Sequence, residues 1–150
     1  MSEDSPEQQL LEHADTIAVI GLSRNPKRDS HIVANHLQRR GYRIVPVHPK
    51  ADDILGEPAY ASIAEIPEAL AAEIDIVDVF RPAEEVPDIV DAALEHLPNL
   101  QGIWTQKAIR HDEAAESARA AGVTVVQDRC IRTQDIYRQF GGGAAAQEAD

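Results

Sequence analysis

Residues 16–30 read TIAVIGLSRNPKRDS, and this stretch decides the fold. Its first five residues are apolar or β-branched, which is typical of a buried strand. Gly21 ends that run, and apolar residues at helical spacing begin after Ser30. A buried strand that enters a helix through a glycine turn is the opening unit of a parallel α/β sheet. Such sheets bind ligands at the carboxyl ends of their strands, where this turn lies.

The same alternation of short β-branched runs and helical segments continues to residue 140. Because strands separated by helices need right-handed crossovers, the sequence predicts an α/β fold. We expect a single doubly wound, Rossmann-like domain over 1–140, with a mainly parallel five-stranded sheet and helices on both faces. The Gly/Ala-rich tail 141–150 is expected to be disordered. The predicted strands are 16–20, 43–47, 75–80, 101–104 and 123–126, and the predicted helices are 5–13, 30–40, 62–72, 83–97, 112–121 and 130–140.

Local signals refine three of these elements. Ser5 is expected to cap the first helix, with Gln8 placed to complete a capping box. Ser62 is expected to cap the helix over 62–72. Pro46 lies inside the second strand and lacks a backbone N–H, which favours a position at a strand end or on the edge of the sheet.

The composition argues against several classes of partner. The chain has 26 acidic and 14 basic residues and a net charge of −12. Nucleic-acid backbones and anionic membranes attract basic proteins, so neither is an expected partner. Lysine occurs only at Lys27, Lys50 and Lys107. An acidic surface with few lysines is typical of a halophile-like protein, because high salt screens its self-repulsion.

Cysteine usage and hydropathy indicate the cellular setting. Cys130 is the single cysteine, which excludes an internal disulfide and a multi-cysteine zinc site, and no metal site is expected. No apolar run approaches the roughly 18 residues of a membrane span. The acidic N-terminus does not resemble a signal peptide, so we expect a cytoplasmic protein.

The loop after the first predicted strand is suited to an anion. It combines a turn glycine, hydroxyl groups and three cations ahead of a helix N-terminus, where free N–H groups and the helix dipole favour negative charge. The dinucleotide fingerprint G-x-G-x-x-G is absent, since Ser23 and Pro26 occupy its second and third glycine positions. Its candidate binding residues are Gly21, Ser23, Arg24, Asn25, Pro26 and Ser30.

The loop after the second predicted strand carries His48, Pro49 and Lys50. A site for NAD places an acidic residue here to accept a hydrogen bond from the ribose 2′-hydroxyl. Cations at this position instead suit a phosphorylated ribose. Two interpretations remain open: the 2′-phosphate of NADP and the 3′-phosphate of coenzyme A.

The remaining loops add weaker candidates. Phe80 could lie against a flat ring, and Arg81 could bind a phosphate through two hydrogen bonds. Trp104 is expected to pack in the core with its N–H bonded, whereas Thr105 and Gln106 offer polar groups at a strand end. Hydrolase and zinc-peptidase motifs are absent, and the histidines are scattered. No catalytic residue is assigned, and the chain is not expected to be an enzyme by itself.

Together, these loops resemble the small bacterial and archaeal CoA-binding proteins. The resemblance rests on the segments 21–26, 46–50, 54–56, 75–81, 104–106 and 128–130. The domain is also similar to the N-terminal CoA-binding region of the succinyl-CoA synthetase alpha subunit. Three residues depart from the family pattern: His48 stands in place of Asn, Ala108 in place of Gly, and Gln134 in place of Glu.

The resemblance implies that coenzyme A lies across the carboxyl ends of the strands. Residues 23–26 would then bind phosphate, and Lys50 would contact the nucleotide phosphates. Phe80 and Arg81 would flank the adenine or the phosphates, and 104–106 would line the pantetheine path. We therefore expect a stand-alone module that binds coenzyme A or an acyl-CoA. The alternatives are an NADP-binding oxidoreductase-type domain and a protein-interaction domain with a vestigial nucleotide pocket.

Overall fold

A five-stranded parallel sheet forms the centre of the protein, whose computed structural model describes residues 5–50 and 52–140. Its strands run in the order β2-β1-β5-β6-β7, and every pairing between neighbours is parallel. This confirms the predicted α/β, Rossmann-like fold. The tail 141–150, expected to be disordered, lies outside the described residues. The strands are β1 (Thr16–Ile20), β2 (Arg43–Val47), β5 (Ile76–Val79), β6 (Gly102–Thr105) and β7 (Thr124–Val126).

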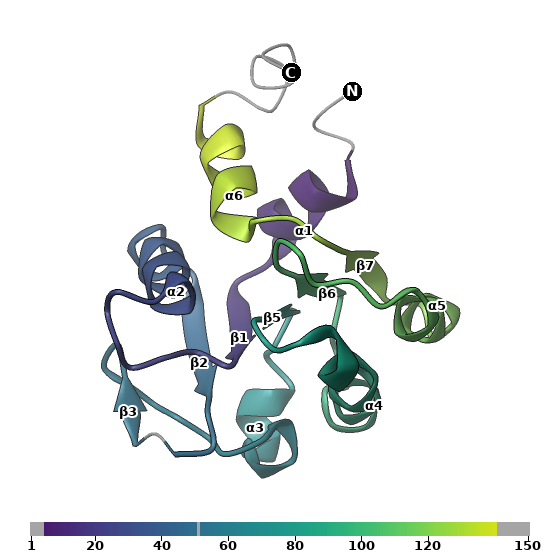
Figure 1. Cartoon of the computed structure of the whole chain (residues 1–150), viewed down its shortest axis with the longest axis horizontal. Helices are drawn as coiled ribbons and strands as arrows, with labels where there is room; N and C mark the ends of the chain where they lie inside the picture. Colours follow the sequence, from purple (N-terminus) through teal and green to yellow (C-terminus); the bar gives the residue numbers. More distant parts are fainter. Residues whose placement is uncertain (1–4, 51, 141–150) are drawn as a thin grey trace.

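Helices cover both faces of the sheet (Figure 1). Alternate strand residues enter two separate buried clusters, so that Val77 and Val79 join one cluster and Ile76 the other. The first cluster lies beneath α3 (Glu68–Ala71), α4 (Val86–His96) and α5 (Asp112–Ala120). The second lies beneath α1 (Pro6–His13), α2 (Asp29–Arg39) and α6 (Ile131–Gln139). Within the described residues, no helix is long and apolar enough to cross a membrane.

The predicted helix over 62–72 is wrong as a continuous element. A 3₁₀ turn, η2, covers Ile63–Glu65, and α3 begins only after Pro67. Proline disfavours helical backbone in the residue before it, and Ile66 is accordingly extended, with φ −68° and ψ 130°. Ser62 makes no side-chain capping bond to this turn. Likewise, the predicted helix 83–97 begins with a 3₁₀ turn, η3 (Ala83–Glu85), ahead of α4.

The N-terminal cap is confirmed in part. Ser5 Oγ accepts a hydrogen bond from the Gln8 backbone N–H at 3.1 Å, as expected of the cap. The reciprocal half of the capping box is wrong, because the Gln8 side chain is buried and donates instead to the Gln134 carbonyl at 3.2 Å. Gln8 therefore joins α1 to α6 rather than closing its own helix.

Pro46 lies on an edge strand, as its missing N–H predicts. Its carbonyl points away from β1 and accepts from the Tyr60 N–H at 3.0 Å, so no bond of the β1–β2 ladder is lost. The chain between β2 and Tyr60 forms a small antiparallel pair, β3 (Asp53–Ile54) and β4 (Glu57–Pro58), which the sequence analysis missed. Its turn residues, Leu55 and Gly56, both have positive φ, as hairpin turns of this length require.

Candidate functional site

The candidate site lies where the strand order reverses, at the carboxyl ends of β1 and β5. Doubly wound sheets bind ligands at this switch point. Gly21 follows β1 with φ +90° and donates its N–H to the Val47 carbonyl at 2.8 Å. A Cβ atom on Gly21 would lie 2.8 Å from Arg81 Cδ and 3.1 Å from the Phe80 carbonyl oxygen. Glycine at this position therefore lets the loops after β1 and β5 touch.

Hydrogen bonds within the first loop fix its shape. The Ser23 N–H donates to Ser30 Oγ, and the Asn25 N–H donates to Ser23 Oγ, both at 3.0 Å. The Asn25 carboxamide oxygen in turn accepts from the Lys27 N–H at 3.0 Å. Ser23, Asn25 and the buried Ser30 thus order the loop, while Arg24 and Pro26 are exposed on it. This network uses none of the cationic side chains of the loop.

Two adjoining cavities open at this edge and share Gly21 and Arg81. The first, here called the polar cavity, has a volume of about 520 Å³ and is lined by Ser23, Lys27, Arg28, Ser30, His48 and Phe80 besides the shared pair and Asp29. The second, the apolar cavity, has a volume of about 340 Å³. Its lining includes Ile20, Val47, Pro49, Ile63, Ile89 and Ala92, with Ser62, Glu85 and Asp88 as polar groups. The site thus offers cations beside an apolar hollow.

Arg81 lies at the boundary between the two cavities and is paired with Glu85. Its Nε donates to Glu85 Oε1 at 3.0 Å, and its NH2 group donates to Oε2 at 2.7 Å. These bonds raise the pKa of the Arg81 guanidinium and lower the pKa of the Glu85 carboxyl. An anionic ligand would therefore have to compete with Glu85 for the Arg81 guanidinium.

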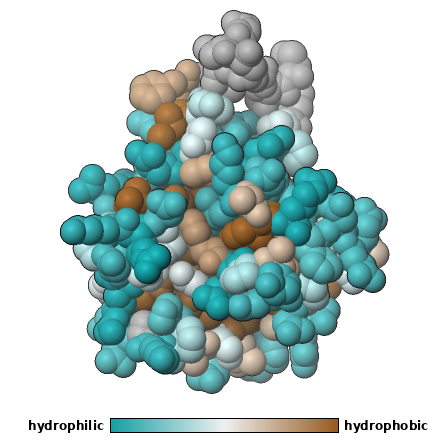
Figure 2. Space-filling view, in the orientation of Figure 1, coloured by the Kyte–Doolittle hydropathy of each residue, from teal (hydrophilic) through white to brown (hydrophobic). Residues whose placement is uncertain are grey.

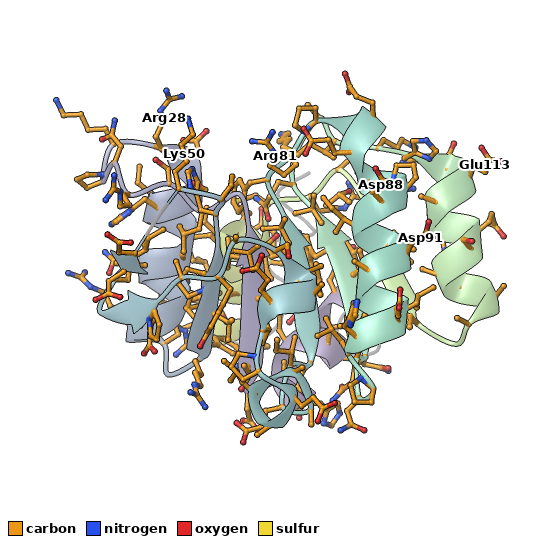
Figure 3. All side chains as sticks on the ribbon, turned by 90° about the horizontal axis from the view of Figure 1, so that it is seen from below. Arg28, Lys50, Arg81, Asp88, Asp91 and Glu113 are labelled. Carbon is orange, nitrogen blue, oxygen red and sulfur yellow. The ribbon has the colours of Figure 1, made fainter. Side chains whose placement is uncertain are left out.

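The second loop brings a further cation to the same edge. His48 lines the polar cavity, and its Nδ1 accepts from the Lys50 N–H at 3.1 Å. That bond makes Nδ1 an acceptor and leaves Nε2 to carry any hydrogen of the neutral ring. Lys50 is exposed, and Figure 3 shows it with Arg28 and Arg81 along one edge of the molecule. The structure thus brings the candidates of the first three loops together.

The candidates at the carboxyl end of β6 are buried and hydrogen-bonded. Trp104 is fully buried and donates its Nε1–H to the Arg129 carbonyl at 2.9 Å, which confirms its expected packing role. Thr105 Oγ1 donates to the Ile109 carbonyl at 2.7 Å, and the Gln106 side-chain oxygen accepts from the Ile131 N–H at 3.3 Å. The side chains of these three residues are hydrogen-bonded within the protein, and none of them lines either cavity.

Ala108 has a backbone conformation that L-residues rarely adopt. Its φ is +71°, and its N–H donates to Asp128 Oδ1 at 2.6 Å. The glycine expected here from the family pattern would hold this conformation without strain. Gln134, another departure from the pattern, contributes its carbonyl to the bond from Gln8 described above.

Some residues of the site were missed as binding candidates. Glu85, Asp88 and Ala92 line the apolar cavity from the segment after β5, and residues 61–64 line it from the connection after β4. The helical spacing of Ile89 and Ala92 was visible in the sequence, but their position over the edge of β1 depends on the tertiary fold. Within the described residues, no group of three metal-ligating side chains occurs.

Charge is divided across the molecule. Arg28, Lys50 and Arg81 lie along the edge that carries the two cavities, whereas Asp88 and Asp91 on α4 and Glu113 on α5 lie to one side (Figure 3). Hydrophilic residues cover most of the face seen in Figure 2, with hydrophobic residues exposed between them near its centre. A local cationic edge thus exists within a chain of net charge −12.

Comparison with known proteins places this chain in a family. A family model described as "CoA binding domain" matches residues 15–134. The chain belongs to the CoA binding domain family. The match covers every strand of the sheet and both cavities.

Individual relatives agree with this assignment. The chain is 38% identical over 125 residues to the uncharacterized protein YneT of Bacillus subtilis, covering 83% of this chain and 88% of YneT. Its fold is similar to that of Prb, a PH1109 protein redesigned for binding, with TM-score 0.82, 30% identity, and coverage of 94% and 93% of the two chains. It is also 33% identical over 87 residues to acetate–CoA ligase (ADP-forming) II of Archaeoglobus fulgidus. That match covers 57% of this chain but only 12% of the ligase, so it extends to one part of a larger protein.

Proposed function

We propose that the protein binds coenzyme A or an acyl-CoA at the switch point, as a binding module without catalytic activity of its own. The observation that carries this proposal is the junction of a cationic cavity and an apolar cavity at Gly21 and Arg81. Coenzyme A combines phosphates with a purine and an aliphatic arm, so it needs both kinds of surface. Membership of the CoA binding domain family supports this ligand.

The phosphates are assigned to the polar cavity. Lys27, Arg28, His48 and Arg81 line it, and the N-terminus of α2 adds backbone N–H groups beside Ser30. Lys50 reaches the same edge and is assigned to the ribose 3′-phosphate. Charge-assisted hydrogen bonds of this kind exceed neutral ones in strength, which allows a local cluster to hold an anion against the acidic exterior.

The adenine is assigned to the apolar cavity. Ile20, Ile63 and Ile89 provide apolar surface for a flat ring, and the Asp88 carboxylate and Ser62 hydroxyl offer acceptors for an exocyclic amine. The pantetheine arm then extends past Phe80 toward residues 104–106 at the carboxyl end of β6. In this arrangement the phosphates contact the polar cavity and the adenine contacts the apolar cavity.

An NADP-binding domain is the alternative, because its 2′-phosphate also suits Lys50. The absence of the second and third fingerprint glycines disfavours it. A vestigial pocket in a protein-interaction domain is the other alternative, and the ordered first loop with its open cationic cavity disfavours that.

Calorimetric titration with coenzyme A, dephospho-CoA and NADP distinguishes these functions. We expect coenzyme A to bind most tightly and NADP not to bind. In Lys50→Ala, coenzyme A should bind about tenfold more weakly, equivalent to roughly 1.4 kcal/mol, while dephospho-CoA should be unaffected. Arg43→Ala is the matched control, because Arg43 lies at the opposite end of the same strand, paired with Glu73. A protein that binds none of the three nucleotides would overturn the proposal.

A further inference from the structure

His48 lines the polar cavity as a neutral ring. It is the half-buried residue that follows β2, and its Nδ1 accepts a hydrogen bond from the Lys50 backbone N–H at 3.1 Å. A ring nitrogen accepts a hydrogen bond only while it carries no hydrogen, whereas a protonated imidazole carries a hydrogen on both nitrogens. The hydrogen bond from Lys50 therefore requires the unprotonated ring, with its one hydrogen on Nε2.

The charge around His48 is mostly positive. The charged residues that line the polar cavity with it, or follow it in its own turn, are Lys27, Arg28, Asp29, Arg81 and Lys50. The backbone N–H of His48 donates to the Tyr60 carbonyl at 2.9 Å, so the segment after β4 meets it through a neutral group. The cations of this set are the groups that the proposed function assigns to the phosphates. A phosphate bound there would lie beside the His48 ring, and a nearby negative charge favours the protonated form of histidine.

Protonation of His48 would change the donors that this edge offers. A proton added at Nδ1 removes the lone pair that accepts from Lys50, so that hydrogen bond is lost. The ring then has an N–H donor on each nitrogen, and the Lys50 backbone N–H becomes available to another acceptor. Phosphate oxygens accept hydrogen bonds, and bonds between charged groups exceed neutral ones in strength. One proton from solvent thus converts His48 from a partner of its own turn into a partner for an anion.

We propose that the binding of coenzyme A is coupled to protonation of His48, so that affinity rises as pH falls. The proposal rests on the proposed function and describes the regulation of the same site. Three features carry it: the hydrogen bond at Nδ1, the place of the ring in the lining of the polar cavity, and the cations beside it. Histidine is the side chain whose charge ordinarily changes between about pH 5 and 8, so the coupling acts near neutral pH.

Asp78 and Asp135 are also able to change their protonation state, but they lie outside the two cavities. Asp78 in β5 is fully buried, and neither of its carboxylate oxygens has a hydrogen-bond partner among the described residues. Burial raises the pKa of its carboxyl well above the usual value. Asp135 in α6, also fully buried, accepts from His36 Nε2 and Arg40 Nε at 2.8 Å each. Neither acid lines a cavity, so a ligand held in the cavities meets His48 and not these two carboxyls.

Calorimetric titration with dephospho-CoA measures the coupled proton. This ligand keeps the diphosphate but lacks the 3′-phosphate, a monoester that itself titrates at about pH 6. Titrations at about pH 7 in buffers of different ionisation enthalpy give the number of protons taken up with each ligand. We expect uptake of a substantial fraction of one proton, and an affinity about fivefold higher at pH 6 than at pH 8.

His48→Asn tests the assignment to this ring. The asparagine side-chain oxygen accepts from an N–H two residues later, as His48 Nδ1 does, but it does not titrate. The variant, which has the residue expected from the family pattern, should bind dephospho-CoA without proton uptake and with the same affinity at both pH values. His96→Asn is the matched control, because His96 ends α4 and lines neither cavity. It should keep the wild-type uptake and pH dependence.

The wild-type protein allows a direct measurement on the ring. The nitrogen-15 chemical shifts of the His48 imidazole distinguish a ring with a bare Nδ1 from one that carries a hydrogen on both nitrogens. At about pH 7 we expect a larger share of the doubly protonated ring in the complex with dephospho-CoA than in the free protein. Equal shares in the two states overturn the proposal.

The outcomes separate this proposal from the proposed function. If dephospho-CoA binds without proton uptake, or if His48→Asn keeps the wild-type uptake, the coupling to His48 is wrong while coenzyme A binding stands. If the wild type binds neither dephospho-CoA nor coenzyme A at any pH, both proposals are wrong.

Discussion

Arg81 and Glu85 form a bidentate ion pair at the boundary of the polar and apolar cavities, with N···O distances of 3.0 and 2.7 Å. The two residues are four apart, so the pair closes over the start of the segment that leads into α4. A phosphate bound at this edge must compete with the Glu85 carboxylate for the same guanidinium.

Glu85→Gln should therefore strengthen coenzyme A binding. Both side chains are partly exposed, and exposed ion pairs contribute at most about 1 kcal/mol, so we expect a gain of about two- to fivefold in affinity. Calorimetric titration measures it. Glu84→Gln, which removes an equal charge from the adjacent exposed residue, should leave affinity unchanged. Equal gains in both variants would mean that net charge, and not the ion pair, controls binding.

Gly21→Ala should weaken both stability and binding. The positive φ costs an L-residue about 1–2 kcal/mol, and the added methyl group would also meet Arg81. Gly122→Ala is the matched control, since Gly122 has φ +89° with open space around it. We expect similar losses in the free energy of unfolding from backbone strain, with an additional loss of about tenfold in coenzyme A affinity only in Gly21→Ala. If Gly21→Ala bound coenzyme A with wild-type affinity, the close approach of Gly21 to Arg81 would not be needed to position Arg81 for binding.

Ala108→Gly should stabilise the protein, because Ala108 holds φ +71°. Glycine relieves the backbone strain, and this gain is larger than the cost of the extra conformational entropy that glycine gives the unfolded chain. The free energy of unfolding, measured by urea denaturation, should therefore rise by about 0.5–1 kcal/mol. The control Ala120→Gly, at the exposed last residue of α5, should instead lose stability, because glycine has a lower helix propensity than alanine. Destabilisation in both variants would show that the Ala108 conformation carries no strain.

Asp78 should make stability depend on pH in an unusual direction. Its folded pKa is raised, mainly by burial, so the neutral carboxyl favours the folded state. This contribution is complete below the unfolded pKa of about 3.9 and is lost as pH rises through the folded pKa. The free energy of unfolding of the wild type should thus fall relative to Asp78→Asn from about pH 4 upward. Urea denaturation across this range measures the difference, and a constant difference would contradict a raised pKa.

The acidic, lysine-poor composition predicts that salt stabilises the protein. With a net charge of −12, self-repulsion opposes the compact state at low ionic strength, and salt screens it within a Debye length of about 3 Å at 1 M. The melting temperature should rise between low and molar sodium chloride. A flat response would reject a halophile-like surface.

The sequence predicted the sheet well because each strand is a buried β-branched run bounded by a turn signal. Val77 and its neighbours in β5 form such a run, and parallel order follows from the helices between strands. The 62–72 segment failed because apolar spacing was given more weight than Pro67, which ends helical backbone locally. The positions of Gly21 and Arg81 at the ends of β1 and β5 followed from the predicted strand boundaries, and both residues line the two cavities.

The pairings within the site could not be predicted in the same way. The Arg81–Glu85 pair and the apolar cavity depend on how the segment after β5 is placed over β1. The orphaned state of Asp78 depends on which face of β5 meets α6, a register that no local pattern encodes.

Pro46 and Tyr60 have a consequence for self-association. The bonds of Tyr60 to the Pro46 carbonyl and from the His48 N–H occupy the outer side of β2 at its carboxyl end, so a strand from another molecule cannot pair with those backbone groups. The opposite border, β7, is three residues long and is flanked by α1 and α5. Strand-to-strand association of copies is therefore disfavoured at the end of β2 beside the cavities, and the short β7 offers few backbone groups for it.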